Sequence, residues 1–162
     1  AKEIDQLELR KVYLSKIKTH EGVKYVWGGE SSRGIDCSGL PRRGFRDALL
    51  SYGLRTGNGG LLRDYAKHWW FDASAEALGQ GYRNYTISTD LNGSIRSMDY
   101  TDLQAGDLAI TDNGMHALAY VGDGQWIQAC PSIGHVEIQD GRDGDSIWFD
   151  MPVSIHRWKL LE

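Results

Sequence analysis

The sequence predicts an α+β fold in which N-terminal helices pack on a central antiparallel β-sheet. Helical periodicity is confined to the first part of the chain, and short strand-like segments separated by turns follow from residue 103 onward. A length of 162 residues, with 41% hydrophobic and 25% charged residues, suits one globular domain. We therefore expect a single domain over residues 1–162.

Two helices are expected near the start of the chain. The first spans residues 3–19 and carries four apolar residues on one face: Ile4, Leu7, Leu14 and Ile17. The second runs from about Cys37 to Tyr52, with Gly53 as its C-terminal cap. Between 53 and 100 the pattern is weaker, with a short helix in LLRDYAKHWWF and a strand and a turn in QGYRNYTISTDLNGS.

Short strands are expected after residue 103. They are DLAI (107–110), HALAYV (116–121), QWIQAC (125–130), HVEIQ (135–139) and VSIHRWKL (153–160). GDG at 122–124 and DGRDG at 140–144 have the composition of β-hairpin turns. Helices followed by such strands predict an antiparallel sheet.

Composition and charge exclude several functions. A formal net charge of −4 without long Lys/Arg runs argues against nucleic-acid binding. No apolar run reaches membrane-spanning length, and no histidine has metal-ligand spacing with a second histidine or cysteine. Two cysteines allow one bridge at most, which rules out a disulfide scaffold. The charged start, AKEIDQLELRK, is not a signal peptide, so we expect a trimmed mature form or export by another route.

The stretch YVWGGESSRGIDCSGL, residues 25–40, places Cys37 where a loop becomes a helix. The positive end of a helix stabilises a thiolate, which is the nucleophilic form of cysteine. Asp36 is a good N-cap residue, and the glycines of loop 28–34 let the backbone approach a ligand closely. Pro41 fits less well, because it lies just past the first turn of a helix that starts at Cys37. Cys37 is a candidate nucleophile, with a small buried core residue as the alternative.

A cysteine nucleophile needs a histidine as its base. Among the five histidines, His116 differs because it opens a predicted strand directly after the turn TDNGM. A residue at that position can face a cleft while the rest of the strand holds it in place. Without Cys37, a half-buried histidine at a strand end is the simpler interpretation.

The two segments together resemble the NlpC family of cell-wall cysteine peptidases. YVWGGESSRGIDCSGL is similar to the family's nucleophile motif, in which an aromatic residue, a Gly-Gly pair and Asp-Cys-Ser-Gly recur. LQAGDLAI followed by MHALAYVGDGQWIQAC resembles its second block, with a Gly-Asp strand, a histidine-led strand and a strand that carries the third catalytic residue. The resemblance, over residues 25–52 and 103–130, implies a papain-like fold.

The resemblance implies that Cys37 is the nucleophile and His116 the general base. The third residue, often histidine in the family, falls on Gln128, which can fix the imidazole tautomer but carries no charge. His135 is the alternative third residue, although it lies beyond Pro131 and outside the motif. We favour Gln128. No metal or cofactor is implied.

Three further residues match family positions in the active site. Tyr25 corresponds to a tyrosine whose hydroxyl points into the site, beside the backbone N–H of Cys37 that would form an oxyanion hole. Asp36 and Ser38 match positions that hold the free amine of a short stem peptide. Packing on the first helix for Tyr25, and helix capping for Asp36, are the structural alternatives.

The chain departs from the family pattern in several places. Residues 53–100 are longer than in compact members, and an insertion there would lie near the cleft and narrow it. The pair Trp69-Trp70 is expected to anchor this insertion, with sugar stacking as the alternative. The run Leu40-Pro41-Arg42-Arg43 is unusually polar for the helix of this family. Cys130 ends the strand of the third residue and is expected to approach the site.

These features predict a peptidoglycan endopeptidase that acts outside the cytoplasm. By resemblance, its partner is the stem peptide, and the bond cleaved joins D-glutamate to a diamino acid. An acyltransferase or amidase with a non-wall substrate is the alternative, whereas intact Cys37 and His116 argue against an inactive wall-binding module. A delivered antibacterial effector with the same chemistry would have an immunity or inhibitor protein as its partner.

Overall fold

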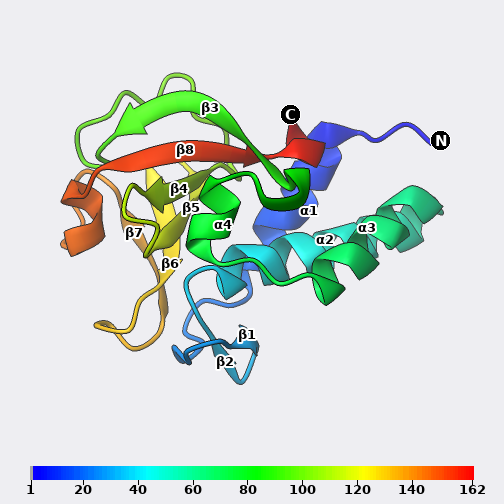
Figure 1. Ribbon diagram of the computed structural model, residues 1–162, viewed down its shortest axis with the longest axis horizontal. Coiled ribbons are helices and arrows are strands. Elements are labelled where there is room, and N and C mark those ends of the chain that lie inside the picture. The colour runs from blue at the N-terminus through cyan, green and yellow to red at the C-terminus, as the bar shows by residue number, and fades with distance from the viewer. Residues whose placement is uncertain (1) are drawn as a thin grey trace.

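In the computed structural model, which describes residues 2–162, the N-terminal helices lie beside a six-stranded antiparallel sheet (Figure 1). The helices are α1 (Gln6–Lys18), α2 (Gly39–Thr56), α3 (Gly59–Trp70) and α4 (Ala75–Gly79), with 3-10 helices η1 (Tyr82–Asn84), η2 (Ile147–Asp150) and η3 (Lys159–Leu161). The strands are β3 (Thr86–Gly93), β4 (Leu108–Thr111), β5 (Ala117–Gly122), β6 (Gln125–Ala129), β7 (Val136–Asp140) and β8 (Val153–Trp158), beside a hairpin of β1 (Glu30–Ser31) and β2 (Gly34–Ile35). The predicted α+β class is confirmed. None of the helices within 2–162 is long and apolar enough to cross a membrane.

The strand order of the sheet is β3-β8-β4-β5-β6-β7, with every neighbouring pair antiparallel. The hairpin predicted at GDG joins β5 to β6. The hairpin predicted at DGRDG is wrong, because β7 is an edge strand and the next strand, β8, lies between β3 and β4. The Asp140 carboxylate accepts hydrogen bonds from Arg142 N (2.8 Å) and Asp143 N (3.0 Å), and this turn leads the chain into η2 instead of back along β7.

α1 buries a face that shares Ile17 with the predicted one, while Ile4 and Leu14 pack partly buried against the same core. Leu7 is 64% exposed, and the buried side chains, spaced four apart, are those of Leu9, Tyr13 and Ile17. Tyr13 accounts for this face, because its ring packs edge-on against Phe45 of α2 and Trp158 of β8. Phe45 and Trp158 are themselves stacked, with ring centroids 4.5 Å apart. Aromatic rings therefore join the two N-terminal helices to the sheet.

α2 begins later than predicted. The Asp36 carboxylate accepts a hydrogen bond from Gly39 N at 2.7 Å, so the first turn starts two residues after Cys37. Pro41 then falls in the first turn, where the backbone N–H groups have no intrahelical partner. Its missing N–H therefore costs no helical hydrogen bond.

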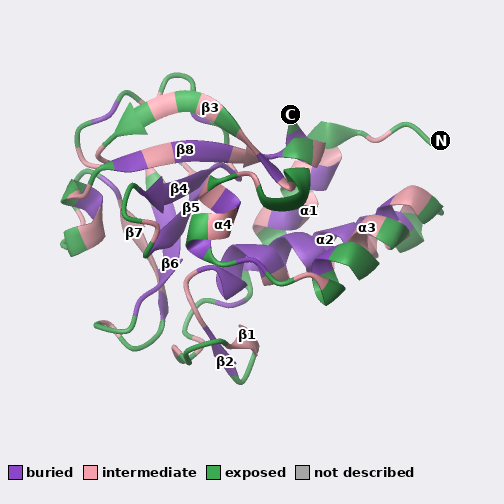
Figure 2. Cartoon of the chain, viewed as in Figure 1, coloured by how far each residue is buried: buried purple, intermediate pink, exposed green. Residues whose placement is uncertain are grey.

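α2 also ends later than predicted, at Thr56. Gly57 has the left-handed backbone conformation, with φ 63°, that ends the helix. Gly53, the predicted cap, instead allows α3 to pack closely, because a Cβ there would lie 3.0 Å from the Leu62 side chain. Figure 2 shows that α2 is buried along most of its length.

The tryptophans of α3 do not anchor the helix to the core. Trp69 and Trp70 are 59% and 74% exposed, whereas Leu61 and His68 are buried. The predicted anchoring role of Trp69 and Trp70 is therefore wrong, and Leu61 and His68 hold the helix in place.

Candidate active site

Cys37 lies just before α2, in a cleft with a volume of about 500 Å³. Loop residues between 27 and 30, residues 72–75 before and at the start of α4, and the turn at 114–115 supply the rest of the lining. Three carboxylates line this cleft, those of Glu30, Asp36 and Asp72, and the described lining contains no Lys or Arg. Glu30 and Asp72 are paired with Arg42, which lies behind the lining, so Asp36 is the carboxylate that would attract a cationic group of a ligand.

Glycines of the segment 25–40 allow the backbone of the loop before Cys37 to pack directly against neighbouring backbone. A Cβ on Gly29 would lie 2.4 Å from Gly34 O, and one on Gly39 would lie 2.4 Å from Gly29 O. Gly28 N also donates to the Asp36 carboxylate at 3.0 Å. The contacts of Gly29 and Gly39 hold the loop against the start of α2, whereas Gly28 lines the cleft with open space beside it.

His116 directly precedes β5, and Gln128 holds its ring. Nε2 of His116 lies 2.8 Å from Gln128 Oε1, and both residues are 1% exposed. Gln128 Nε2 donates to Ser146 Oγ at 2.9 Å, with Oε1 turned toward the imidazole. Because Oε1 can only accept, Nε2 carries the imidazole proton and Nδ1 is the acceptor. His135, the alternative third residue, is exposed and pairs with Lys24 through the backbone.

An indole ring from η2 covers the imidazole. Trp148 stacks on His116, with centroids 4.2 Å apart and planes at 20°. The indole N–H donates to Cys130 Sγ at 3.3 Å, and both cysteines are free. Trp148 and Ser146 are part of the site that the sequence analysis missed. Nothing in the motif pattern marks them, because η2 has no periodicity that ties it to β5.

The thiol of Cys37 contacts the backbone beside His116. Sγ lies 3.8 Å from Met115 O, and within residues 2–162 no hydrogen bond joins it to the imidazole. Burial, and then the charge of Asp36, raise the pKa of Cys37 to about 11. Backbone hydrogen bonds from Cys37 and Ser38, at the helix start, lower this pKa as predicted, but burial and the charge of Asp36 outweigh them. Burial lowers the pKa of His116 to about 4, so thiol and imidazole are both neutral at neutral pH.

The remaining predicted residues lie around the thiol. Burial, and then the charge of Cys37, raise the pKa of Tyr25, so its hydroxyl keeps its proton at neutral pH and can donate it in a hydrogen bond. Asp36 accepts backbone hydrogen bonds with both of its oxygens, and Ser38 Oγ lies 3.5 Å from one of them. Ser38 occupies the N-cap position of α2, and Asp36, two residues earlier, accepts the N–H of Gly39 while it also lines the cleft.

A buried arginine joins two parts of the cleft lining. The guanidinium of Arg42, 2% exposed, contacts the carboxylates of Glu30 and Asp72 and donates to His68 O at 3.3 Å. Arg46 Nη1 donates to the same Glu30 at 3.1 Å. The polar run at the start of α2 is thus explained: its arginines tie β1 and the end of α3 to the helix that follows Cys37.

The fold and site define the class as a papain-like α+β domain, with a cysteine at a helix start and a histidine at the edge of a sheet strand. The profile of the NlpC/P60 family matches residues 22–149, and the chain belongs to this family. The resemblance found in the sequence is therefore confirmed. A comparison with curated protein sequences finds no match.

Solved structures show the same fold. Among them are NlpC1 from Trichomonas vaginalis (TM-score 0.59, 21% identity, 93% of this chain and 44% of that one) and the P60 domain of antigen MAP1204 from M. avium subspecies paratuberculosis (0.55, 21%, 98% and 99%). A third is the peptidoglycan hydrolase RipB from Mycobacterium tuberculosis (0.56, 18%, 95% and 67%). The chain spans less than half the length of the two Trichomonas vaginalis proteins, NlpC1 (44%) and NlpC2 (49%).

Proposed function

We propose that this protein is a peptidoglycan hydrolase, a cysteine endopeptidase that cleaves an amide of the stem peptide. Membership of the NlpC/P60 family supports this chemistry, and one structural relative is itself a peptidoglycan hydrolase. The observation that carries the proposal is the position of Cys37 in an open cleft, with its Sγ 3.8 Å from the carbonyl oxygen of Met115, directly before His116, whose Nε2 is held by Gln128. With this substrate, the protein acts outside the cytoplasm.

In the proposed reaction, His116 acts as a general base during the attack. The thiol turns from Met115 O toward Nδ1, which takes its proton while Sγ bonds to the carbonyl carbon. Negative charge develops on the carbonyl oxygen, where the backbone N–H of Cys37 and the Tyr25 hydroxyl donate. His116 returns the proton to the leaving amine as the C–N bond breaks. Water then attacks the thioester while Nδ1 accepts its proton, and the C–S bond breaks as that proton passes to Sγ, which restores the thiol.

The acidic cleft supports a substrate with free amines. Asp36 and Ser38 would hold the free amine of a short stem peptide, and the scissile bond is D-glutamyl–diamino acid by resemblance to the family. Residues 72–75 belong to the expected insertion, 53–100, and line the same cleft. They would narrow it, which favours a thin, extended peptide over a folded protein chain.

Digestion of purified sacculi tests the proposal. We expect new amino termini on the diamino acid, identified by mass spectrometry, with the wild-type protein. Cys37→Ala should yield none while its circular dichroism stays unchanged, and Cys130→Ser should retain most activity, because serine keeps an acceptor for the Trp148 indole. Equal digestion by Cys37→Ala, or cleavage only within the glycan, would contradict the proposal. Amide formation with an added amine, without hydrolysis, would identify an acyltransferase instead.

A further inference from the structure

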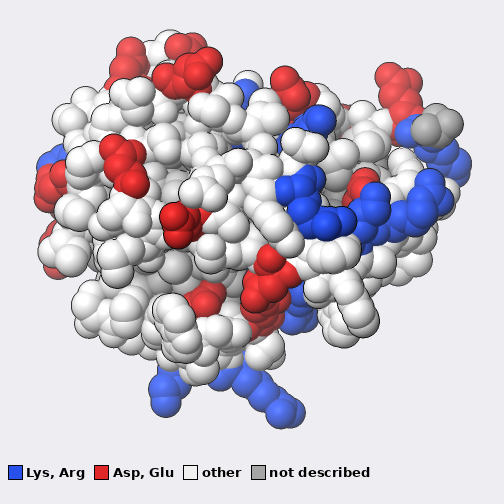
Figure 3. Space-filling model, in the orientation of Figure 1, with Lys and Arg blue, Asp and Glu red and all other residues white. Residues whose placement is uncertain are grey.

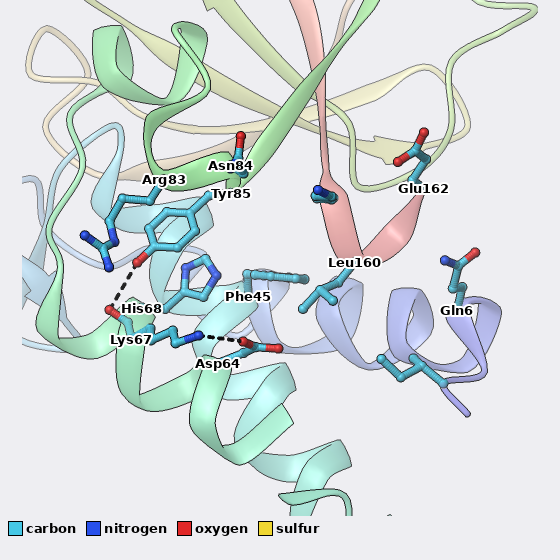
Figure 4. A pocket seen from close by; sticks show the side chains of 12 residues that line it. Gln6, Phe45, Asp64, Lys67, His68, Arg83, Asn84, Tyr85, Leu160 and Glu162 are labelled. Carbon is cyan, nitrogen blue, oxygen red and sulfur yellow. Dashed lines mark hydrogen bonds and ion pairs between the residues drawn. The ribbon is translucent and has the colours of Figure 1, made fainter. Parts of the chain in front are cut away.

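A second cavity lies between α3, η1 and the C-terminal end of the chain (Figure 4). Its volume is about 420 Å³, which is the size of a small-molecule site. It shares no lining residue with the cleft of Cys37. Phe45, His68, Tyr85 and Leu160 supply its aromatic and apolar lining, and Figure 4 shows the His68 ring beneath Tyr85.

His68 is a buried polar group that the fold leaves without a partner. It is 5% exposed, and its ring stacks on Tyr85 with centroids 3.9 Å apart. Within residues 2–162, Nδ1 of His68 has no hydrogen-bond partner. Burial, and then the charges of Arg42 and Arg46, lower the pKa of His68 to about 3, so the ring stays neutral. A buried polar atom of this kind calls for a partner from outside the chain, either water or a ligand.

Three cations also line the cavity: Lys67, Arg83 and Lys159. In the part of the chain that the structure describes, neither Arg83 nor Lys159 forms an ion pair, and Lys67 approaches Asp64 only to 3.9 Å. The Arg83 guanidinium lies 3.5 Å above the Phe71 ring centroid. Figure 3 shows Lys and Arg gathered over α3 and beside the C-terminus, although the whole protein has a net charge of −4.

The backbone that presents Arg83 is strained. Arg83 (φ 52°) and Asn84 (φ 57°) are consecutive non-glycine residues in the left-handed region, and both line the cavity. Such residues gather at ligand sites, where the surrounding structure holds them. The strain directs Arg83 to one end of the cavity, while Glu162 lies at the opposite end in Figure 4.

We propose that this cavity binds a small organic anion with a flat apolar body. The carboxylate or phosphate head lies at the end lined by Arg83 and Lys67, with Lys159 adding positive charge, because an unpaired guanidinium suits a planar or tetrahedral oxyanion. The body packs on Tyr85 and Leu160. Two carboxylates also line the cavity: Asp64, beside Lys67, and Glu162, at the end opposite Arg83, so the head lies against Arg83.

Titrations followed by heteronuclear NMR test the proposal with four probes on the whole chain: phenyl phosphate, benzoate, inorganic phosphate and benzyl alcohol. We expect saturable shifts at the residues that line the cavity with phenyl phosphate or benzoate, weaker binding of inorganic phosphate, and none of benzyl alcohol. The tighter of the first two probes identifies the head group. Benzyl alcohol binding as well as benzoate, or shifts that never saturate, would overturn the proposal.

Charge-removing variants locate the head group. Arg83→Gln should weaken binding of the better probe about tenfold or more, as expected for loss of a hydrogen bond to a charged group. The matched control is Arg33→Gln, which removes an exposed arginine outside the cavity and should leave affinity unchanged. If Arg83→Gln does not fold, Lys159→Gln, on an exposed side chain, provides the same test. Equal losses with Arg33→Gln and the cavity variant would overturn the proposal.

Discussion

Two buried histidines each stack on an aromatic ring, one next to the cleft of Cys37 and one in the second cavity, in surroundings of opposite charge. His116 lies under Trp148 beside the acidic cleft, and His68 lies under Tyr85 beside a basic rim. Burial lowers the pKa of both imidazoles. Only His116 has a partner, Gln128, that fixes its tautomer. The comparison teaches that burial alone keeps a histidine neutral. A hydrogen-bond partner that holds the proton on one ring nitrogen leaves the second ring nitrogen free to act as a base.

The largest effect is expected at Arg42, where the two regions meet. Arg42→Met removes contacts to Asp72, on the cleft side, and to the carbonyl of His68, on the other. It also leaves the partly buried Glu30 with Arg46 alone. We expect a loss of about 3 kcal/mol in the free energy of unfolding, measured by urea denaturation. Arg55→Met, at an exposed ion pair, should lower the free energy of unfolding by less than about 1 kcal/mol. An equal loss in both variants would contradict the role of Arg42 in joining β1 and the end of α3 to α2.

The next effect separates the two histidines by function. Gln128→Ala should lower turnover roughly tenfold to a hundredfold with little change in KM, because the tautomer and the developing imidazolium lose their support. Gln128→His should be tolerated. The matched control is His135→Ala, which should keep full turnover. Full turnover in Gln128→Ala together with a loss in His135→Ala would make His135 the third residue.

The pH dependence of the free energy of unfolding tests whether burial lowers the pKa of both histidines. The pKa falls from about 6.5 in the unfolded chain to about 4 for His116 and about 3 for His68. The unfolded state therefore binds more protons between these values, so their contribution is complete above the unfolded pKa and is lost as pH falls through the folded values. His68→Gln should flatten this slope by up to about 1.4 kcal/mol per pH unit, measured by urea unfolding across the acid range. His135→Gln, which changes an exposed histidine, should leave the slope unchanged. An unaltered slope in His68→Gln would contradict the lowered pKa of His68.

The smallest effect concerns the two stacked rings. Trp148→Leu removes the ring that covers His116, and we expect turnover to fall about threefold to tenfold, in line with the energy of an aromatic pair. Tyr85→Leu removes the equivalent ring from His68 and should leave turnover unchanged. The measurement is the turnover of one peptidoglycan fragment by both variants. An equal loss of turnover in both would show that the rings act by stabilising the fold as a whole.

Local chemistry explains what the sequence predicted well. The turn GDG sits between two segments of strand composition, so the β5–β6 hairpin followed from residues close in the chain. Twelve residues across that hairpin place His116 and Gln128 side by side, and their hydrogen bond is present in the structure. Their catalytic roles remain predictions.

Contacts between distant segments explain what the sequence missed. β8 lies between β3 and β4, a pairing that no turn motif specifies. The buried face of α1 depends on Tyr13 meeting rings from α2 and β8. Trp148 comes from a short 3-10 helix beyond β7, and Ser146 directly precedes that helix. The raised pKa of Cys37 depends on burial that no motif reveals.

The central claim is that Cys37 rests as a neutral thiol and is activated only when His116 accepts its proton. The direct test is the rate of Cys37 alkylation by iodoacetamide as a function of pH, with peptide mapping to separate it from the buried Cys130. We expect a rate that is low at neutral pH and keeps rising through the alkaline range toward a pKa of about 11. A rate that is already constant between mildly acidic and neutral pH, as a preformed thiolate–imidazolium pair would give, would contradict the claim.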